Sequence, residues 1–217
     1  MPNPLSSNPP HDCPLCPRLV EFRNYQQSRY PNAHNQPVAE FGDPDGRLLI
    51  VGLAPGQRGA NSTGRPFTGD YAGKVLYPAL LKFGFARGVF AENADDGLEL
   101  IDCRITNAVR CLPPQNRPTA AEINQCRPFL KASIGTSDRL RVILALGRIA
   151  HESVLRCHGH SLAGHPFVHG QNHVIDDKLT LVDSYHCSQY NIFTRRLSVE
   201  QFESIVSHCN LILKNII

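Results

Sequence analysis

From residue 47 onward, short apolar runs alternate with stretches whose apolar residues recur at helical spacing. The runs at 48–51 and 141–146 are typical of strands buried on both faces, and further strands are expected at 103–109 and 179–183. The intervening stretches predict helices that begin near residues 70, 119, 147 and 198. This alternation predicts an α/β fold, a three-layer sandwich with a largely parallel central sheet.

Several of these helices carry their own start and stop signals. Asp70 is a typical N-cap residue, and Gly84 would end its helix at about residue 83. Thr119 and Glu122 have the spacing of a capping box, and Ser198 is followed by a glutamine at the same spacing.

Residues 1–46 are rich in Pro, Asn and Gln and show little periodicity. We expect an irregular N-terminal arm with one short helix near 18–25, attached to a single domain that spans 1–217. The N-terminus has no basic and apolar leader, and no run of apolar residues is long enough to cross a membrane. The sequence therefore predicts a cytoplasmic protein without a membrane partner.

Composition places the chain among globular proteins. Of its 217 residues, 41% are hydrophobic and 19% are charged, which is enough to bury a core and excludes a disordered chain. Lys and Arg number 22 against 19 Asp and Glu, so the formal net charge is +3. This mild basic excess permits nucleic acid as a partner but does not by itself indicate one.

Eight cysteines in a cytoplasmic protein need an explanation other than disulfides. Cys13 and Cys16 are separated by two residues, and together with Cys111 and Cys126 they could ligate zinc or an iron–sulfur cluster. Only one pair is closely spaced, which favours the cluster over zinc. Alternatively, the first pair is redox-active or incidental and the second pair is buried in the core. Core or incidental positions are expected for the other four, which have no partner at ligand spacing: Cys103, Cys157, Cys187 and Cys209.

Ligands of parallel sheets bind beyond the carboxyl ends of the strands. This rule selects the loops after Val51, Val109 and Val182, and we expect their polar groups to converge. The first loop is rich in glycine but has neither a dinucleotide fingerprint nor the Gly-Lys-Ser/Thr ending of a phosphate-binding loop.

Four residues in or beside these loops each allow more than one role. Phe67 can plug the core or stack on a base, and Asp70 can simply cap its helix. Asn107 can form a turn, or offer a donor and an acceptor to the edge of a nucleobase. His186 can contact a phosphate, belong to the core or act as an electrophile.

Taken together, the motifs resemble the B-type (family five) uracil-DNA glycosylases. They are Gly-Leu-Ala-Pro-Gly at 52–56, Gly-Ala-Asn at 59–61, Thr-Gly-Arg-Pro-Phe-Thr-Gly-Asp at 63–70, Ile-Thr-Asn-Ala-Val-Arg-Cys at 105–111, Ser-Tyr-His-Cys-Ser-Gln-Tyr-Asn at 184–191 and Phe-Thr-Arg-Arg-Leu at 193–197. The resemblance covers nearly the whole chain. It implies a four-stranded parallel sheet between helices, a 4Fe-4S cluster on Cys13, Cys16, Cys111 and Cys126, and base excision from DNA.

This activity gives the loop residues specific expected roles. Gly52, Leu53, Phe67 and Asn107 would bind the flipped base, with the Phe67 ring on its face and the Asn107 amide on its edge. His186 would donate a hydrogen bond to uracil O2 as negative charge develops there.

Water activation and DNA contact fall to other residues. Many superfamily members have an acidic or amide residue where this chain has Leu53, so Asp70 is the nearest anion for positioning water. Ser188, Tyr190 and Arg195 are expected to contact DNA, with Tyr190 as the wedge. Further arginines that could neutralise phosphates are Arg110, Arg117 and Arg196.

The sequence departs from the family pattern at two places. Cys187 replaces the proline of the usual His-Pro-Ser motif, and Gln57 and Arg58 replace the commoner Ala-His.

The expected function is thus hydrolysis of the N-glycosidic bond of uracil in DNA by a monomeric, monofunctional enzyme. Hypoxanthine, xanthine and 5-hydroxymethyluracil are further candidate substrates. The rivals are a non-catalytic nucleic-acid-binding protein with a structural zinc, and a phosphate-cleaving hydrolase. The hydrolase is disfavoured because the chain has no clustered carboxylates for a metal.

Overall fold

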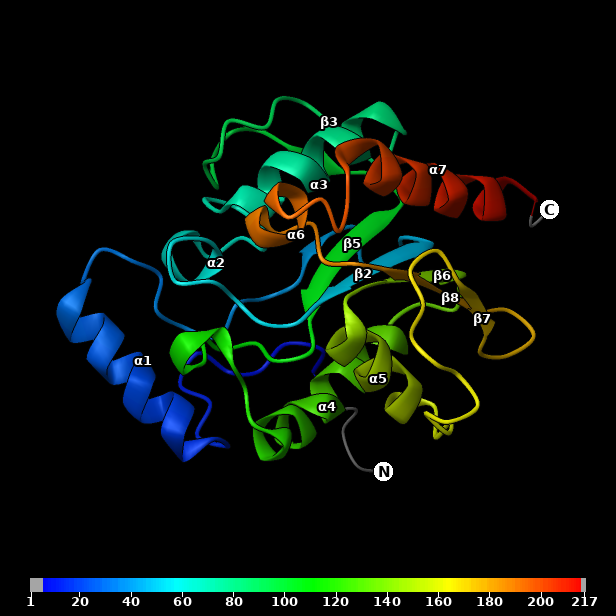
Figure 1. Cartoon of the computed structure of the whole chain (residues 1–217). Coiled ribbons are helices and arrows are strands. Elements are labelled where there is room, and N and C mark those ends of the chain that lie inside the picture. The colour runs from blue at the N-terminus through cyan, green and yellow to red at the C-terminus, as the bar shows by residue number, and fades with distance from the viewer. Residues whose placement is uncertain (1–5, 216–217) are drawn as a thin grey trace.

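The computed structural model describes residues 6–215, in which six strands form one sheet in the order β1-β5-β2-β6-β8-β7 (Figure 1). The four middle strands run parallel: β5 (Cys103–Asn107), β2 (Leu48–Gly52), β6 (Val142–Leu146) and β8 (Thr180–Ser184). This confirms the expected parallel sheet. The antiparallel edge strands β1 (Phe41–Gly42) and β7 (Asn172–Val174) were not predicted, because so few residues carry no readable pattern.

Helices cover both faces of the sheet, as the strand–helix alternation predicts. Helices α3 (Tyr71–Lys82) and α7 (Val199–Asn215) lie on one face, and α4 (Ala120–Ile134) and α5 (Arg148–Cys157) lie on the other (Figure 1). None of the helices within residues 6–215 is long and apolar enough to span a membrane.

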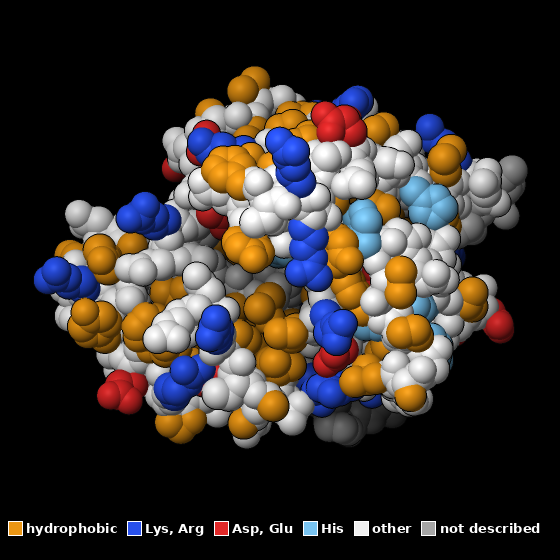
Figure 2. All heavy atoms as spheres, in the orientation of Figure 1, with side chains coloured by type: hydrophobic (Ala, Val, Ile, Leu, Met, Phe, Trp, Pro, Cys, Tyr) orange, Lys and Arg blue, Asp and Glu red, His pale blue; other side chains and the backbone are white. Residues whose placement is uncertain are grey.

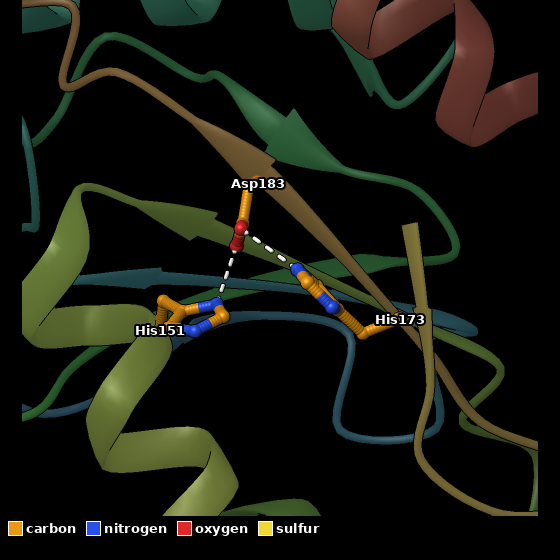
Figure 3. A group of neighbouring side chains, drawn as sticks. All are labelled: His151, His173 and Asp183. Carbon is orange, nitrogen blue, oxygen red and sulfur yellow. Dashed lines mark hydrogen bonds and ion pairs between the residues drawn. The ribbon is translucent and has the colours of Figure 1, made fainter. Parts of the chain in front are cut away.

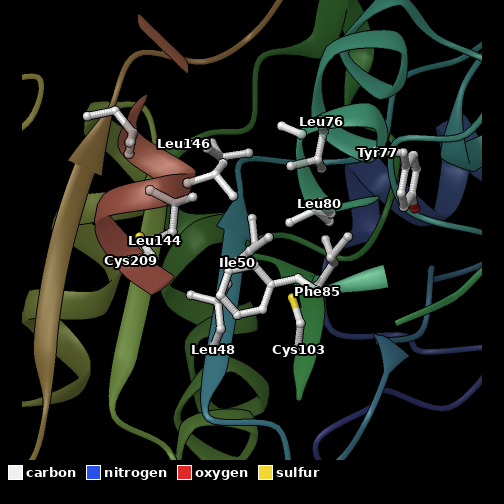
Figure 4. Close-up of a cluster of buried hydrophobic side chains, with 14 of the residues drawn as sticks. Leu48, Ile50, Leu76, Tyr77, Leu80, Phe85, Cys103, Leu144, Leu146 and Cys209 are labelled. Carbon is white, nitrogen blue, oxygen red and sulfur yellow. The ribbon is translucent and has the colours of Figure 1, made fainter. Parts of the chain in front are cut away.

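Successive side chains of a strand point to opposite faces of the sheet. Because both faces are covered by helices, both sets are buried, and the strand sequence is a continuous apolar run. In β2, Leu48 and Ile50 join the core beneath α3 and α7, whereas Leu49 and Val51 join the core beneath α4 and α5. Figure 4 shows the first of these cores, where Leu76 of α3 and Cys209 of α7 pack on the strands. The four cysteines assigned to the core from the sequence are all buried.

The remaining elements are short and connect the layers. The predicted arm contains a longer helix than expected, α1 (Pro17–Arg29). The others are α2 (Ala60–Thr63), β3 (Ala86–Arg87), β4 (Glu99–Leu100), η1 (Pro114–Asn116) and α6 (Gln189–Phe193).

The predicted capping signals operate in the structure. The Asp70 side chain accepts from the Gly73 N–H at 3.2 Å, and Thr119 and Glu122 form a reciprocal capping box.

Buried arginines hold the irregular segments to the sandwich. Arg65 makes two charge-assisted bonds to Asp96, at 2.7 and 2.8 Å, and its guanidinium lies 5.2 Å from the centre of the Phe41 ring. Arg110 donates to Glu40 at 2.9 Å and to the Asn8 side chain at 3.2 Å, which ties the N-terminal arm to the end of β5. Because Arg110 is buried and paired, it is not available to neutralise DNA phosphates as the sequence suggested.

We predict that Arg65→Leu lowers the free energy of unfolding by about 3–5 kcal/mol, because it leaves the Asp96 carboxylate without its counter-charge, bonded only to the N–H groups of Ala91 and Leu98. Urea unfolding measures this loss. Arg87→Leu is the matched control, since the Arg87–Glu99 pair is 70% and 60% exposed and its loss should cost less than about 1 kcal/mol. Equal losses in the two variants would contradict the anchoring role of Arg65.

Candidate functional site

A cleft of about 880 Å³ lies beyond the carboxyl ends of the parallel strands. It is lined by residues of the loops after β2, β5 and β8, so the convergence predicted from the sequence is confirmed. A fourth segment, residues 146–150 after β6, also lines the cleft and was not predicted. The available signal was Gly147, which follows β6 directly, much as Gly52 ends β2. Figure 2 shows this face of the molecule, with basic side chains around a central hollow.

Gly52 allows the first two candidate groups to meet. It pairs in register with Asn107 across β2 and β5. A Cβ at Gly52 would lie 2.4 Å from Asn107 Oδ1 and 2.8 Å from Phe67 Cζ. Only glycine therefore lets the amide and the ring approach this closely. Asn107 is 4% exposed and its amide makes no hydrogen bond to another described side chain or backbone group, so the amide is free to bind a ligand in the cleft.

Phe67 is held in a strained backbone conformation. Its φ is +54°, a region that non-glycine residues rarely adopt. Tyr77 fixes the preceding residue by donating its hydroxyl to the Pro66 carbonyl at 2.5 Å, and a Cβ at Gly73 would lie only 1.8 Å from the Phe67 carbonyl oxygen. The surrounding structure thus sustains the strain that points the ring at the cleft.

His186 lies beside Phe67, with ring centroids 6.0 Å apart and planes tilted by 32°. Burial lowers the pKa of His186 to about 4, so its imidazole is neutral at physiological pH. Its ring makes no hydrogen bond to any other described residue and lines the cleft. The Asn191 amide fixes the backbone here by donating to the His186 carbonyl at 2.8 Å.

Asp70 combines the two roles that its position allowed. One carboxylate oxygen caps α3, while the other faces the glycine loop, where a Cβ at Gly59 would lie 2.3 Å from it. Burial raises the pKa of Asp70, although the N–H groups of Gly73 and Ala72 oppose this. The residue is therefore a helix cap that also lines the cleft with a carboxylate.

Cys187 stands where the family motif has proline, and it anchors the loop by a different contact. It is fully buried, and its thiol donates to the Ala72 carbonyl at 3.6 Å. Burial raises the pKa of this thiol, which keeps it protonated and able to donate. The bond ties the His186 loop to the start of α3. The other departures, Gln57 and Arg58, both line the cleft.

The expected DNA-contact residues divide between the cleft and its surroundings. Ser188 lines the cleft, as does Leu53, which was expected to bind the base, and the Ser188 hydroxyl also caps α6. Tyr190 is 72% exposed on α6 and does not line it. Arg195 has a φ of +58° and also lies outside the lining, whereas its neighbour Arg196 lines the cleft with its guanidinium 4.5 Å from the centre of the Tyr185 ring.

The four candidate ligand cysteines lie together around a second, smaller hollow between α1, α4 and the end of β5. They are Cys13, Cys16, Cys111 and Cys126. Four thiolates on one tetrahedral zinc would lie about 3.8 Å apart, because each Zn–S bond is about 2.3 Å long. Within residues 6–215, no three of these sulfurs lie within 4.8 Å of one another. As placed, these four thiols do not form a compact tetrahedral site for one ion.

A third cluster, His151, His173 and Asp183, was missed from the sequence (Figure 3). Its signal is the density of histidines between 151 and 173. The three residues are close enough to hold a metal, but both ring nitrogens of His151 already face acceptors, Asp183 Oδ1 at 2.7 Å and the His165 carbonyl at 2.9 Å. His151 could therefore serve as a metal ligand only by giving up one of these two hydrogen bonds.

Comparison with known proteins gives a consistent family. The family model described as the uracil DNA glycosylase superfamily matches residues 39–209. The chain is 41% identical to the type-5 uracil-DNA glycosylase of Thermus thermophilus, over 89% of this chain and 90% of that protein. It is 38% identical to the type-5 enzyme of Pyrobaculum aerophilum, over 90% and 86%, and 42% identical to that of Mycobacterium leprae, over 89% and 88%. These matches confirm the resemblance seen in the motifs.

Proposed function

The chain belongs to the uracil DNA glycosylase superfamily, and on this premise we propose that it hydrolyses the N-glycosidic bond of uracil in DNA, leaving an abasic site for base-excision repair. The observation that carries the proposal is the meeting of the Phe67 ring, the Asn107 amide and the His186 imidazole around one cleft.

Cleavage of this bond leaves negative charge on the base and positive charge on the sugar. Phe67 would stack on the face of the flipped uracil, and the Asn107 amide would pair with its edge. His186 would donate its N–H to uracil O2, where charge accumulates. A neutral imidazole is suited to this because a preorganised donor stabilises the developing anion without carrying a charge of its own.

Asp70 is the proposed partner of the sugar and the water. Its free carboxylate oxygen lies in the cleft, and Leu53 cannot take a proton. An ionised Asp70 would favour the sugar cation and orient water toward it.

We also propose that the four cysteines hold a 4Fe-4S cluster. Thiolates are the usual ligands of such clusters, and the four cysteines line one hollow in which no three of their sulfurs lie within 4.8 Å of one another. When bound, the cluster would cross-link the N-terminal arm to α4 and the end of β5. Its proposed role is therefore structural.

The distribution of arginines supports DNA as the partner. Most arginines in residues 6–215 are paired with acidic or carbonyl groups. Those whose side chains make no ion pair or hydrogen bond to another described residue are Arg29, Arg58, Arg117, Arg148, Arg195 and Arg196. Three of these, Arg58, Arg148 and Arg196, line the cleft from three different segments. We propose that they bind phosphates around the extruded nucleotide, with Arg195, Ser188 and Tyr190 as further contacts. The proposed setting is a monomer in the cytoplasm.

The proposed activity is tested by incubating the protein with a uracil-containing duplex and measuring free uracil and alkali-labile sites under single-turnover conditions. We predict that Asp70→Asn slows base release by about 10²-fold or more. Asparagine can still cap α3, and it removes a carboxylate that burial disfavours, so the thermal midpoint should be equal or higher.

An unchanged rate in this variant would remove Asp70 from the mechanism. No uracil release by the wild-type protein would overturn the proposed function and favour a non-catalytic DNA-binding protein. The same assay with hypoxanthine, xanthine and 5-hydroxymethyluracil measures the breadth of the pocket.

We expect the purified protein to be brown and to contain about four iron atoms per chain. Cys111→Ser should lose most of this iron, whereas Cys157→Ser, which alters a buried cysteine outside the cluster hollow, should retain it. Elemental analysis and visible absorbance measure both. Stoichiometric zinc in a colourless protein would contradict the cluster assignment.

Arg196→Gln and Arg195→Gln remove the same charge from adjacent positions. Loss of a phosphate contact at Arg196 should reduce the slope of log Kd against log salt by about 1, whereas Arg195, outside the cleft lining, should matter less. Fluorescence anisotropy with duplex DNA at several salt concentrations measures the slopes. Equal changes in slope for the two variants would mean that DNA binding depends on the net charge of the protein and not on a phosphate contact at Arg196.

A further inference from the structure

The Asp183 carboxylate, near the end of β8, is fully buried and accepts three hydrogen bonds, two of which are drawn in Figure 3. The donors are His151 Nδ1 at 2.7 Å, His173 Nε2 at 3.0 Å and the Val168 N–H at 3.2 Å. None of these groups lines the cleft, and the proposed chemistry uses none of them. Burying the Asp183 carboxylate away from water costs free energy, and we therefore expect this network to have a role.

The geometry fixes the charge of His151. Its Nδ1 faces a carboxylate and its Nε2 faces the His165 carbonyl at 2.9 Å, and both partners can only accept. With Asp183 ionised, both ring nitrogens would carry protons, so the ring would be an imidazolium in a buried ion pair with Asp183. Burial alone lowers the pKa of His151, but the hydrogen bond and charge of Asp183 raise it above the ordinary value.

The ion pair holds one segment of chain, residues 165–171, which we term the wall segment. His165 accepts from His151 and Val168 donates to Asp183, as described above. The backbone of Asp183 also accepts from the Gly170 N–H at 2.9 Å and donates to the Gln171 carbonyl at 3.0 Å. One residue of β8 thus bonds to this segment with both its side chain and its backbone.

The wall segment in turn shapes the cleft. Phe167 lines the cleft. Its ring centroid lies 5.7 Å from that of His151, edge-on, and 5.9 Å from that of Tyr185, tilted by 51°. The His169 ring stacks on Tyr185 at 4.9 Å, and its Nδ1 accepts from the Tyr185 backbone N–H at 3.1 Å. Tyr185 directly precedes His186.

We propose that His151 and Asp183 are positioning residues, which act by locking the wall segment so that Phe167 and the Tyr185–His186 backbone are fixed in the cleft. The proposed effect on base release rests on the glycosylase function, whereas the protonation state and the locking of the segment do not.

The ion pair makes the lock sensitive to pH in one direction. Because the native pKa of His151 is raised, the stabilisation is complete below about pH 6.5 and is lost as the pH rises through the native pKa. The groups facing His151 are Asp183 from β8, His173 from β7, Glu152 from its own helix, and His165 and Phe167 from the wall segment. The wall segment should therefore loosen on the alkaline side.

The first test is independent of activity and uses the wild-type protein. In a ¹⁵N-histidine spectrum at neutral pH, we expect both nitrogens of His151 to be protonated. We also expect the hydrogen-exchange protection factors of the Val168 and Gly170 amides to fall together as His151 titrates at alkaline pH. A bare nitrogen on His151 at neutral pH would overturn the proposal, whatever the protein does to uracil.

The second test measures the consequence for base release. In Asp183→Asn, His151 lacks its counter-charge, so we expect kcat to fall by roughly 10- to 100-fold with a smaller change in KM, and the alkaline limb of the pH profile to move to lower pH. His208→Gln alters a half-buried histidine that is bonded to Asn172, and it should change neither kcat nor the pH profile. A folded Asp183→Asn variant with the wild-type kcat and pH profile would overturn the positioning role.

The two tests separate the possible failures. Should Asp183→Asn not fold, the wild-type spectrum and exchange data still decide whether the lock exists. An inactive wild-type protein whose His151 is doubly protonated would overturn the glycosylase function and leave the lock standing.

Discussion

The contact at Gly52 is the constraint on which the rest of the cleft depends. At this point a parallel strand pair ends, and the missing side chain lets the Asn107 amide and the Phe67 ring approach across it. Any larger residue would collide with both groups. The parallel order of β5, β2, β6 and β8 brings the loop carrying His186 to the same edge, so three segments distant in the chain form one binding site.

Two kinds of interaction stabilise the structure around this site. The sheet and its helices are held by apolar cores on both faces, which need no charged residue. The irregular segments are held by buried charges: Arg65 with Asp96 beneath the glycine loop, Arg110 with Glu40 at the N-terminal arm, and His151 with Asp183 beside the wall segment. Loops have few apolar contacts of their own, and ion pairs with fixed hydrogen-bond geometry give them a single position.

The parallel strands could be predicted from the sequence because burial on both faces leaves continuous apolar runs such as Leu48–Val51. The meeting of Phe67, Asn107 and His186 followed from the same strands, since their carboxyl ends share one edge. The edge strands β1 and β7 could not be predicted, because their pairing depends on neighbours rather than on their own residues.

Other features depend on geometry that the sequence does not carry. Arg195 and Arg196 are chemically equivalent in the sequence, and the positive φ of Arg195 accompanies a turn that leaves only Arg196 in the cleft lining. The Asp183 network joins three elements whose histidines have no characteristic spacing. The roles of the individual site residues remain predictions.

The central claim is that the extruded uracil occupies the space between Phe67, Asn107 and His186. A crystal structure of the protein with abasic DNA and free uracil tests it most directly. The account predicts the Phe67 ring against the face of the base, the Asn107 amide on its edge, and a ring nitrogen of His186 about 2.7–3.2 Å from uracil O2. Uracil bound elsewhere in the cleft, without contact to these three side chains, would contradict it.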